Sequence, residues 1–286
     1  MPSPGRNRSL DELRVTLGSS KFDLKRRTPT HMESIYETDS ALNTYLLFHY
    51  GNAEDQLPYS FGPHEALLYP VRCVREFVDE IGPIDRALDL GCSVGRSTFE
   101  LARFAGEVVG IDLSSRFITA AQEIRETGEI RILRRVEGDF SRPITRHLPA
   151  EINRSRCRFQ IGDATRLSAE LGKFDLVLAA NLLDRVDSPR ALLEACIRAT
   201  SVQGHLILAS PYTWLSEYAP SEAWLGGKQT AAGTLIPTVQ TLESILTPAF
   251  QLVRTKDLPF LISETIRKYQ WSVAEASLWR RVEGGE

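Results

Sequence analysis

Residues 87–102, ALDLGCSVGRSTFELA, pass from an apolar run through a glycine turn into a helical pattern. The apolar run ends at Asp89, and Gly91 and Gly95 stand four residues apart before the helical spacing begins. A strand, a glycine turn and a helix in this order are typical of the first unit of a nucleotide-binding α/β domain. We therefore expect a cofactor to bind at this turn.

The rest of the chain repeats the alternation of strand and helix. Apolar and β-rich runs predict strands at 86–90, 107–114, 157–164, 174–181, 204–212, 250–262 and 269–281. Helical patterns lie between several of these runs, which indicates parallel strands with helices on both faces of the sheet. The polar link 263–268 is short, so the last strand is expected to be antiparallel. The predicted fold is α/β and Rossmann-like, with a mostly parallel seven-stranded sheet.

One internal stretch and the front of the chain depart from this alternation. Residues 128–156 predict an extra strand or a hairpin inserted before the third strand. Residues 1–32 are polar and weakly patterned, which predicts a flexible lead-in. Apolar and aromatic residues then occur at helical spacing, with Thr38 or Asp39 placed to cap a helix and Gly51 to end it.

A further helix is predicted over 71–82, where Gly82 and a proline stop the pattern. We expect residues 33–85 to form a helical segment that covers the substrate as a lid. Residues 86–286 are expected to form the cofactor-binding core.

The composition is that of an ordinary globular protein. The chain has 286 residues, of which 42% are hydrophobic and 25% charged, and its net charge is −3. No apolar run approaches the length of a membrane span, and the first residues do not resemble a signal peptide. Four widely separated cysteines without a C-x-x-C pair indicate neither disulfides nor a metal site. We expect a cytoplasmic protein without a nucleic-acid or membrane partner.

The spacing of the glycine turn distinguishes between cofactors. A dinucleotide turn needs G-x-G-x-x-G, because the backbone must approach a pyrophosphate closely. Here Ser93 stands where the close-approach glycine would be. S-adenosylmethionine has no pyrophosphate, so its site tolerates a small side chain there. Gly91 would let the backbone pass beneath the amino-acid part of that cofactor, and Gly95 would allow close packing of strand and helix.

Acidic residues end three successive predicted strands. Asp89 can orient the turn or reach the ammonium group of the cofactor. Asp112 follows the turn by about twenty residues, where a carboxylate accepts both ribose hydroxyls. Asp163 is placed to accept from the adenine amino group, while the Ala164 N–H can donate to the ring. Each acid alone could be a helix cap or a solvated loop residue, but together they indicate an S-adenosylmethionine site.

Two other classes of protein use a similar turn. An NAD-dependent dehydrogenase would share Asp112, but Ser93 and the lack of a convincing Tyr-x-x-x-Lys or Cys/His pair disfavour it. A non-catalytic partner protein that binds no cofactor is disfavoured because all the expected glycines and acids are present. The expected cofactor contacts are Arg72, Asp89, Gly91, Cys92, Ser93, Gly95, Asp112, Leu113, Asp163, Ala164 and Asn181.

The chain resembles the methyltransferase domain of ovothiol biosynthesis, which is usually the C-terminal part of a sulfoxide synthase. The resemblance covers about residues 33–281. It is carried by YETDSALNTYLLFHYG, YSFGPHEALLYPVRC, FDLVLAANLLDRV, SPYTWLSEYAPSEAWLGG and FLISETIRKYQWSVAEASLWRR. The run LDLGCSVGRSTFELAR is shared more widely, with all class I S-adenosylmethionine-dependent methyltransferases.

The resemblance implies methylation of the side-chain-proximal imidazole nitrogen of 5-thiohistidine, which gives ovothiol A. Nothing in the chain matches the iron-binding synthase modules, so a separate sulfoxide synthase is expected to supply the substrate. Another small amino-acid, imidazole or thiol substrate would use the same glycine turn and is the alternative acceptor class.

For this chemistry we expect catalytic roles for Asn181, His49 and Tyr212. Asn181 follows the fourth predicted strand, beside the transferred methyl group, and can fix the acceptor ring by a hydrogen bond. His49 is either a buried structural histidine or a substrate contact or proton acceptor. Arg72 is a candidate for a carboxylate of the cofactor or the substrate. The expected substrate contacts are Tyr36, Glu37, His49, Tyr50, Tyr212 and Trp214.

Overall fold

A computed structural model of the chain describes residues 36–230 and 232–283. The lead-in expected over residues 1–32 lies outside this part. The helices are α2 (Asp39–Tyr50), α3 (Ala53–Gln56), α4 (Tyr69–Arg75), α5 (Arg96–Leu101), α6 (Ser115–Thr127), α7 (Pro189–Ala199) and α8 (Thr238–Leu246). The strands are β1 (Ile84–Leu90), β2 (Ala105–Asp112), β3 (Glu129–Glu137), β4 (Phe140–His147), β5 (Cys157–Ile161), β6 (Phe174–Ala180), β7 (Thr200–Ser210), β8 (Lys228–Gln229), β9 (Leu235–Ile236), β10 (Phe250–Thr265) and β11 (Lys268–Arg281).

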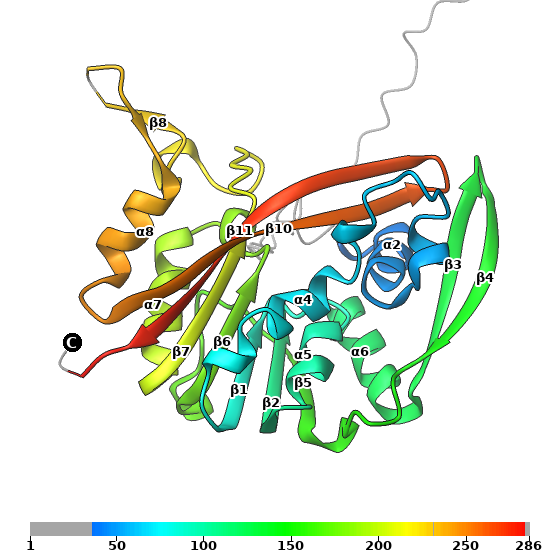
Figure 1. Cartoon of the computed structure of the whole chain (residues 1–286), viewed down its shortest axis with the longest axis horizontal. Coiled ribbons are helices and arrows are strands. Elements are labelled where there is room, and N and C mark those ends of the chain that lie inside the picture. The colour runs from blue at the N-terminus through cyan, green and yellow to red at the C-terminus, as the bar shows by residue number, and fades with distance from the viewer. Residues whose placement is uncertain (1–35, 231, 284–286) are drawn as a thin grey trace, which may run out of the picture.

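Seven strands form one sheet in the order β10-β11-β7-β6-β1-β2-β5 (Figure 1). The neighbours from β7 to β5 are parallel. Strand β11 is antiparallel to both of its neighbours, β7 and β10. The predicted α/β fold, with a mostly parallel seven-stranded sheet and an antiparallel last strand, is confirmed.

The central strands of the sheet are mostly apolar and are buried on both faces. In β6, Leu176 and Leu178 pack with α2, α4, α5 and α6 on one face. Val177 and Ala179 point the opposite way and pack with α7 and α8. This arrangement explains the nearly continuous apolar run that predicted a strand covered on both sides.

Helix α2 begins and ends where the sequence predicted. The Thr38 side chain accepts a hydrogen bond from the Ala41 N–H at 3.1 Å, and the Gly51 N–H bonds to the Leu47 carbonyl at 2.8 Å. The helix predicted over 71–82 is shorter and begins earlier. Pro70 suits its first turn, and the helix ends at Arg75, before the 3-10 turn η2 (Val78–Glu80).

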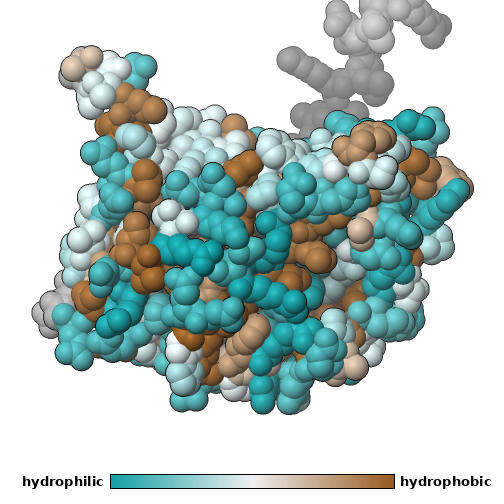
Figure 2. Space-filling view, viewed as in Figure 1, coloured by the Kyte–Doolittle hydropathy of each residue, from teal (hydrophilic) through white to brown (hydrophobic). Residues whose placement is uncertain are grey.

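The inserted stretch forms the hairpin β3–β4, which is a separate two-stranded sheet. Figure 1 shows α2 lying between this hairpin and the long hairpin β10–β11. No helix in the described part of the chain is long and apolar enough to cross a membrane. Figure 2 shows that hydrophilic residues cover most of the face in view, and that hydrophobic residues occur there in separate groups.

Candidate active site

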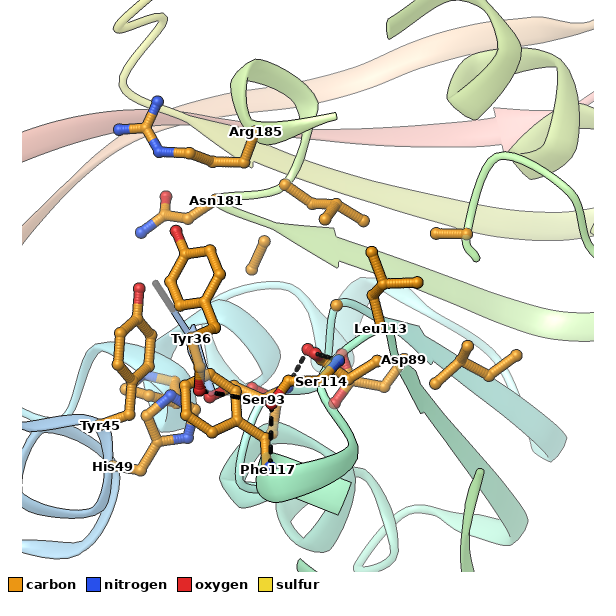
Figure 3. Close-up of a pocket in the computed structure, with 18 of the residues that line it drawn as sticks. Tyr36, Tyr45, His49, Asp89, Ser93, Leu113, Ser114, Phe117, Asn181 and Arg185 are labelled. Atoms are coloured by element: carbon orange, nitrogen blue, oxygen red, sulfur yellow. Dashed lines mark hydrogen bonds between the residues drawn. The ribbon is translucent and has the colours of Figure 1, made fainter. Parts of the chain in front are cut away.

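The carboxyl ends of the parallel strands border a cavity of about 1230 Å³, a volume that includes its part open to solvent. Strands β1, β2 and β6 bring their last residues to this edge, and α2 lies across it (Figure 3). Most of the residues predicted for the cofactor and substrate meet here. The predicted residues that line the cavity are Tyr36, Glu37, His49, Asp89, Gly91, Ser93, Asp112, Leu113, Asp163, Ala164 and Asn181.

Asp112 holds the glycine turn against the end of β2. Its carboxylate accepts hydrogen bonds from the backbone N–H groups of Ser93 at 2.8 Å and Ser114 at 2.9 Å. Gly91 and Ser93 both have left-handed backbones, with φ of 70° and 50°, and such a backbone is costly for serine. Burial raises the pKa of Asp112, while the two N–H groups act against this rise. Since an ionised carboxylate can accept about four hydrogen bonds, Asp112 retains acceptor capacity for a ligand.

Asp89 lies one residue before the end of β1, beneath the turn, and is only 2% exposed. Its carboxylate accepts a hydrogen bond from the Thr98 hydroxyl at 2.7 Å. Burial raises the pKa of Asp89 to about 7, because a charged group loses solvation in the interior. A cationic group beside Asp89 would favour its ionised form.

This burial gives the stability of the protein without ligand a testable pH dependence. The carboxyl group of Asp89 binds its proton more tightly in the folded chain than in the unfolded chain. The free energy of unfolding should therefore fall as pH rises from about 4 to about 7, and level off above. We expect Asp89→Asn to remove this contribution and to raise the free energy of unfolding at pH 8 by at most roughly 4 kcal/mol. Urea unfolding of both proteins across this pH range measures the difference, and identical profiles would contradict it.

Asp163 lies at the cavity wall and also shapes the loop after β5. Its Oδ1 accepts from the Thr165 N–H at 2.8 Å and the Thr165 hydroxyl at 2.6 Å. Arg166 approaches the other oxygen at 3.6 Å. The Asp163 side chain therefore both stabilises the local turn and forms part of the cavity wall. Ala164 lies buried beside it.

Asn181 is held by a residue that the sequence did not predict. The hydroxyl of Tyr69, from α4, donates a hydrogen bond to the Asn181 Oδ1 at 2.7 Å. Asn181 has a left-handed backbone with φ of 52°, which asparagine tolerates better than most residues. Because Oδ1 already has this partner, the Asn181 Nδ2 is the donor available to a ligand.

His49 projects from α2 into the wall of the cavity and is 6% exposed. Its Nδ1 is buried and has no hydrogen-bond partner among the described residues. Burial, with a smaller effect from the nearby Arg96, lowers the pKa of His49 to about 3. His49 is therefore neutral near pH 7, which disfavours the role of proton acceptor that the sequence left open.

The start of α2 is fixed to α6 over the cavity. The ring of Phe117 lies 5.0 Å from that of Tyr45 and 5.8 Å from that of Tyr36. The Ser115 hydroxyl donates to the Glu37 carboxylate at 3.2 Å. This contact places Glu37 near Asp112, at the end where the cofactor is expected, rather than at the acceptor end for which it was predicted.

Two aromatic residues predicted to contact the substrate lie outside the cavity lining. Tyr212 has a left-handed backbone, with φ of 52°, and its hydroxyl donates to Glu275 at 2.8 Å. The indole N–H of Trp214 donates to the Thr238 hydroxyl at 3.0 Å, which fixes this loop to α8. These bonds turn both side chains away from the site, so the structure does not support the catalytic and substrate roles predicted for them.

Three more residues that were predicted to contact a ligand lie outside the cavity lining and bond to or pack against the backbone around it. The Arg72 guanidinium donates to the carbonyl oxygens of Leu67, at 2.9 Å, and Pro259, so it does not face a ligand carboxylate as predicted. The Tyr50 hydroxyl donates to the Val94 carbonyl at 2.6 Å. Cys92 is buried beneath the turn and does not line the cavity.

Gly95 also acts through packing rather than ligand contact. A Cβ atom there would lie 2.7 Å from the Phe159 ring, so only glycine allows this approach of turn and sheet.

Further residues that the sequence did not predict also line the cavity. Tyr69, Phe117 and Arg185 line it. Arg185 follows Asn181 by four residues in the loop after β6, and that position at the sheet edge is the one signal that could have indicated it. Tyr69 gave no such signal, because it lies 112 residues away from Asn181 in the sequence.

Comparison with known proteins finds similarity to methyltransferases over part of the chain. The family described as "Methyltransferase domain" matches residues 88–208. A ubiquinone biosynthesis O-methyltransferase of Xanthomonas oryzae is 28% identical over 153 residues, which are 52% of this chain and 53% of that protein. The same enzyme of Psychrobacter cryohalolentis is 25% identical over 125 residues, 44% of this chain and 40% of that protein. The chain thus spans about half the length of these relatives, or less.

Solved structures with similar folds are more distant in sequence. The N-methyltransferase NodS of Bradyrhizobium japonicum, in complex with S-adenosylhomocysteine, has 17% identity and a TM-score of 0.49, and the match covers 85% of this chain and 99% of that one. A methyltransferase of Methanosarcina mazei has 18% identity and a TM-score of 0.48, with 73% and 97% covered.

Proposed function

We propose that this chain, whose residues 88–208 match a methyltransferase domain, uses S-adenosylmethionine to methylate the imidazole nitrogen of 5-thiohistidine and so gives ovothiol A. One observation supports this choice of acceptor, beyond methyl transfer from S-adenosylmethionine in general. The amide of Asn181, oriented by Tyr69, faces a chamber that α2 closes with aromatic rings. Such a chamber suits a small, polar, planar acceptor. The runs that resemble the ovothiol family supply α2 and the loop that holds Asn181.

The residues at the other end of the cavity fit the cofactor. They are chiefly carboxylates, which accept hydrogen bonds: Asp89 would accept from an ammonium group and Asp112 from the ribose hydroxyls. The buried Ser93 hydroxyl has no partner among the described residues, so a polar ligand would satisfy it. When bound here, S-adenosylmethionine would supply a methyl group on a positively charged sulfur; the acceptor nitrogen would provide the electron pair of the new nitrogen–carbon bond, and sulfur would keep that of the carbon–sulfur bond.

The chain's own contribution at the acceptor end is alignment. In-line transfer requires the nitrogen lone pair to point at the methyl carbon, and correct positioning supplies several kcal/mol of the barrier. Asn181 and neutral His49 can hold the ring of the acceptor by hydrogen bonds, while α2 limits the access of water. Neither group favours taking the proton of the reacting nitrogen, so we propose that the acceptor binds with this nitrogen already deprotonated, its proton having left to bulk solvent.

We expect 5-thiohistidine to be methylated at least tenfold more efficiently than histidine, because contacts made to the sulfur are left unmet when it is absent. Incubation with S-adenosylmethionine, followed by mass spectrometry, measures both products. A catechol belongs in the same panel, since the curated relatives are O-methyltransferases. Preferential methylation of the catechol, or equal turnover of the two amino acids, would count against an ovothiol role. A separate sulfoxide synthase is the proposed source of the substrate.

A further inference from the structure

We infer that Arg185 binds the α-carboxylate of the acceptor, so that the site selects a free amino acid. This inference rests on the proposed function, in which the acceptor is an amino acid with an imidazole ring. Arg185 lines the same cavity as Asn181. Figure 3 shows its guanidinium near the Asn181 amide, at the end of the view opposite Asp89 and Ser93.

The guanidinium of Arg185 is fixed through one of its nitrogens. Its Nη1 donates to the Asp184 carboxylate at 3.0 Å and to the carbonyl oxygen of Thr213 at 2.9 Å. Within residues 36–230 and 232–283, Nε and Nη2 have no hydrogen-bond partner. These two nitrogens form an edge of the guanidinium that can bind a carboxylate through two parallel hydrogen bonds.

Asp184 positions Arg185 and leaves this edge for a ligand. The Asp184 side chain is fully buried. It also accepts from the Ser210 hydroxyl at 3.1 Å and the Thr213 N–H at 2.8 Å. The carboxylate is thus committed to the protein on both oxygens, and its bond to Arg185 holds the guanidinium before any ligand binds. Little side-chain entropy then remains to be lost on binding.

The surroundings of Arg185 are aromatic and hydroxyl-bearing. The guanidinium lies over the Tyr218 ring, 4.7 Å from its centre, a stacking that arginine favours. The hydroxyls of Tyr218 and Tyr45 lie beside that of Tyr36. Burial raises the pKa of Tyr36, so this hydroxyl keeps its proton and can donate to an anion.

The charges of the cavity are separated in a way that fits this assignment. Besides Arg185, its charged lining residues are four acids, and these belong to the end with the glycine turn and β2, or to the loop after β5: Glu37, Asp89, Asp112 and Asp163. The end with Arg185 therefore presents a cation and hydroxyl donors, which suit an anionic group of a ligand, whereas the acidic end suits a cationic group. A peptide-bound residue, a carboxamide or a neutral quinol offers no anion to Arg185.

The test compares 5-thiohistidine with its carboxamide, by calorimetry on the full chain saturated with S-adenosylhomocysteine. For the wild type, we expect the carboxamide to bind roughly 10- to 100-fold more weakly, as the loss of a charge-assisted pair predicts. Arg185→Met should lower the affinity for the acid by a similar factor and leave the affinity for the carboxamide unchanged. Arg185→Lys should recover part of the loss. The matched control is Arg190→Met, because Arg190 is exposed on α7.

The outcomes separate this inference from the proposed function. Equal affinity of the wild type for the acid and the carboxamide, or an equal loss of both in Arg185→Met, would overturn the carboxylate assignment. If histidine and 5-thiohistidine bind alike and both bind better than their carboxamides, the anchor stands and the ovothiol role fails. If 5-thiohistidine is methylated no more efficiently than its carboxamide, the ovothiol role stands and the assignment of Arg185 to the carboxylate fails. The wild-type comparison of ligands decides the matter even if Arg185→Met proves unstable.

Discussion

Asp112→Ala is expected to weaken the binding of S-adenosylhomocysteine at least tenfold, and by about 100-fold if both ribose hydrogen bonds are lost. The loss has two causes. The variant lacks the carboxylate that is predicted to accept from the ribose hydroxyls. It also lacks the acceptor for the backbone N–H groups of Ser93 and Ser114, so the glycine turn loses one of its attachments to the end of β2 and keeps those to the Ile111 carbonyl. Calorimetric titration measures the affinity.

The chain contains a matched control for this change. Asp175 also accepts two backbone N–H groups, those of Asp85 and Arg86, each at 2.9 Å. It does not line the cavity. Asp175→Ala should lower the free energy of unfolding and leave the affinity unchanged. If Asp112→Ala binds the nucleoside as tightly as the wild type, Asp112 is not the ribose ligand.

Removing the Asn181 amide is expected to lower kcat by roughly 100-fold, because misalignment of the acceptor by about 1 Å has this effect. Asn181→Gly is the better variant, since glycine adopts the left-handed backbone of this position without strain. Tyr69→Phe should lower kcat about tenfold, and the double variant should be little worse than Asn181→Gly alone, because Tyr69 acts through Asn181. Steady-state kinetics and S-adenosylhomocysteine titration of all three variants test this.

Tyr269→Phe serves as the control for loss of a tyrosine hydroxyl, because that hydroxyl donates to the Ile266 carbonyl outside the cavity lining. Its kcat should equal that of the wild type. A thermal stability loss in Tyr69→Phe and Asn181→Gly with normal kinetics would assign the Tyr69–Asn181 pair a purely structural role.

Local patterns in the sequence predicted the frame of this protein. The cap at Thr38 and the stop at Gly51 gave the limits of α2, because both act through bonds within a few residues. The acids Asp89 and Asp112 were predicted to lie at one sheet edge, because the ends of parallel strands must meet there. No element was predicted between the fifth and sixth strands, where α8 and the short pair β8–β9 lie.

The acceptor end was predicted less well because its contacts join distant segments. Tyr212 and Trp214 follow β7 at the expected edge, but hydrogen bonds to Glu275 and Thr238 turn them outward. The same loop instead brings Tyr218 to Arg185. Position after a strand thus indicated the loop correctly, but it did not indicate which side chain of the loop contacts a residue that lines the cavity.

The position of β11 has a consequence for how this protein is made. Residues 275–280 of β11 pair with 205–210 of β7, and β10 reaches the sheet only through β11. During synthesis, β10 therefore leaves the ribosome before its place beside β11 exists. Since α2 packs against β10, the aromatic residues of α2 also cannot reach their final positions over the cavity until β11 has been translated. Contacts so distant in sequence slow folding, and the exposed edge of β7 is open to wrong pairing in the meantime.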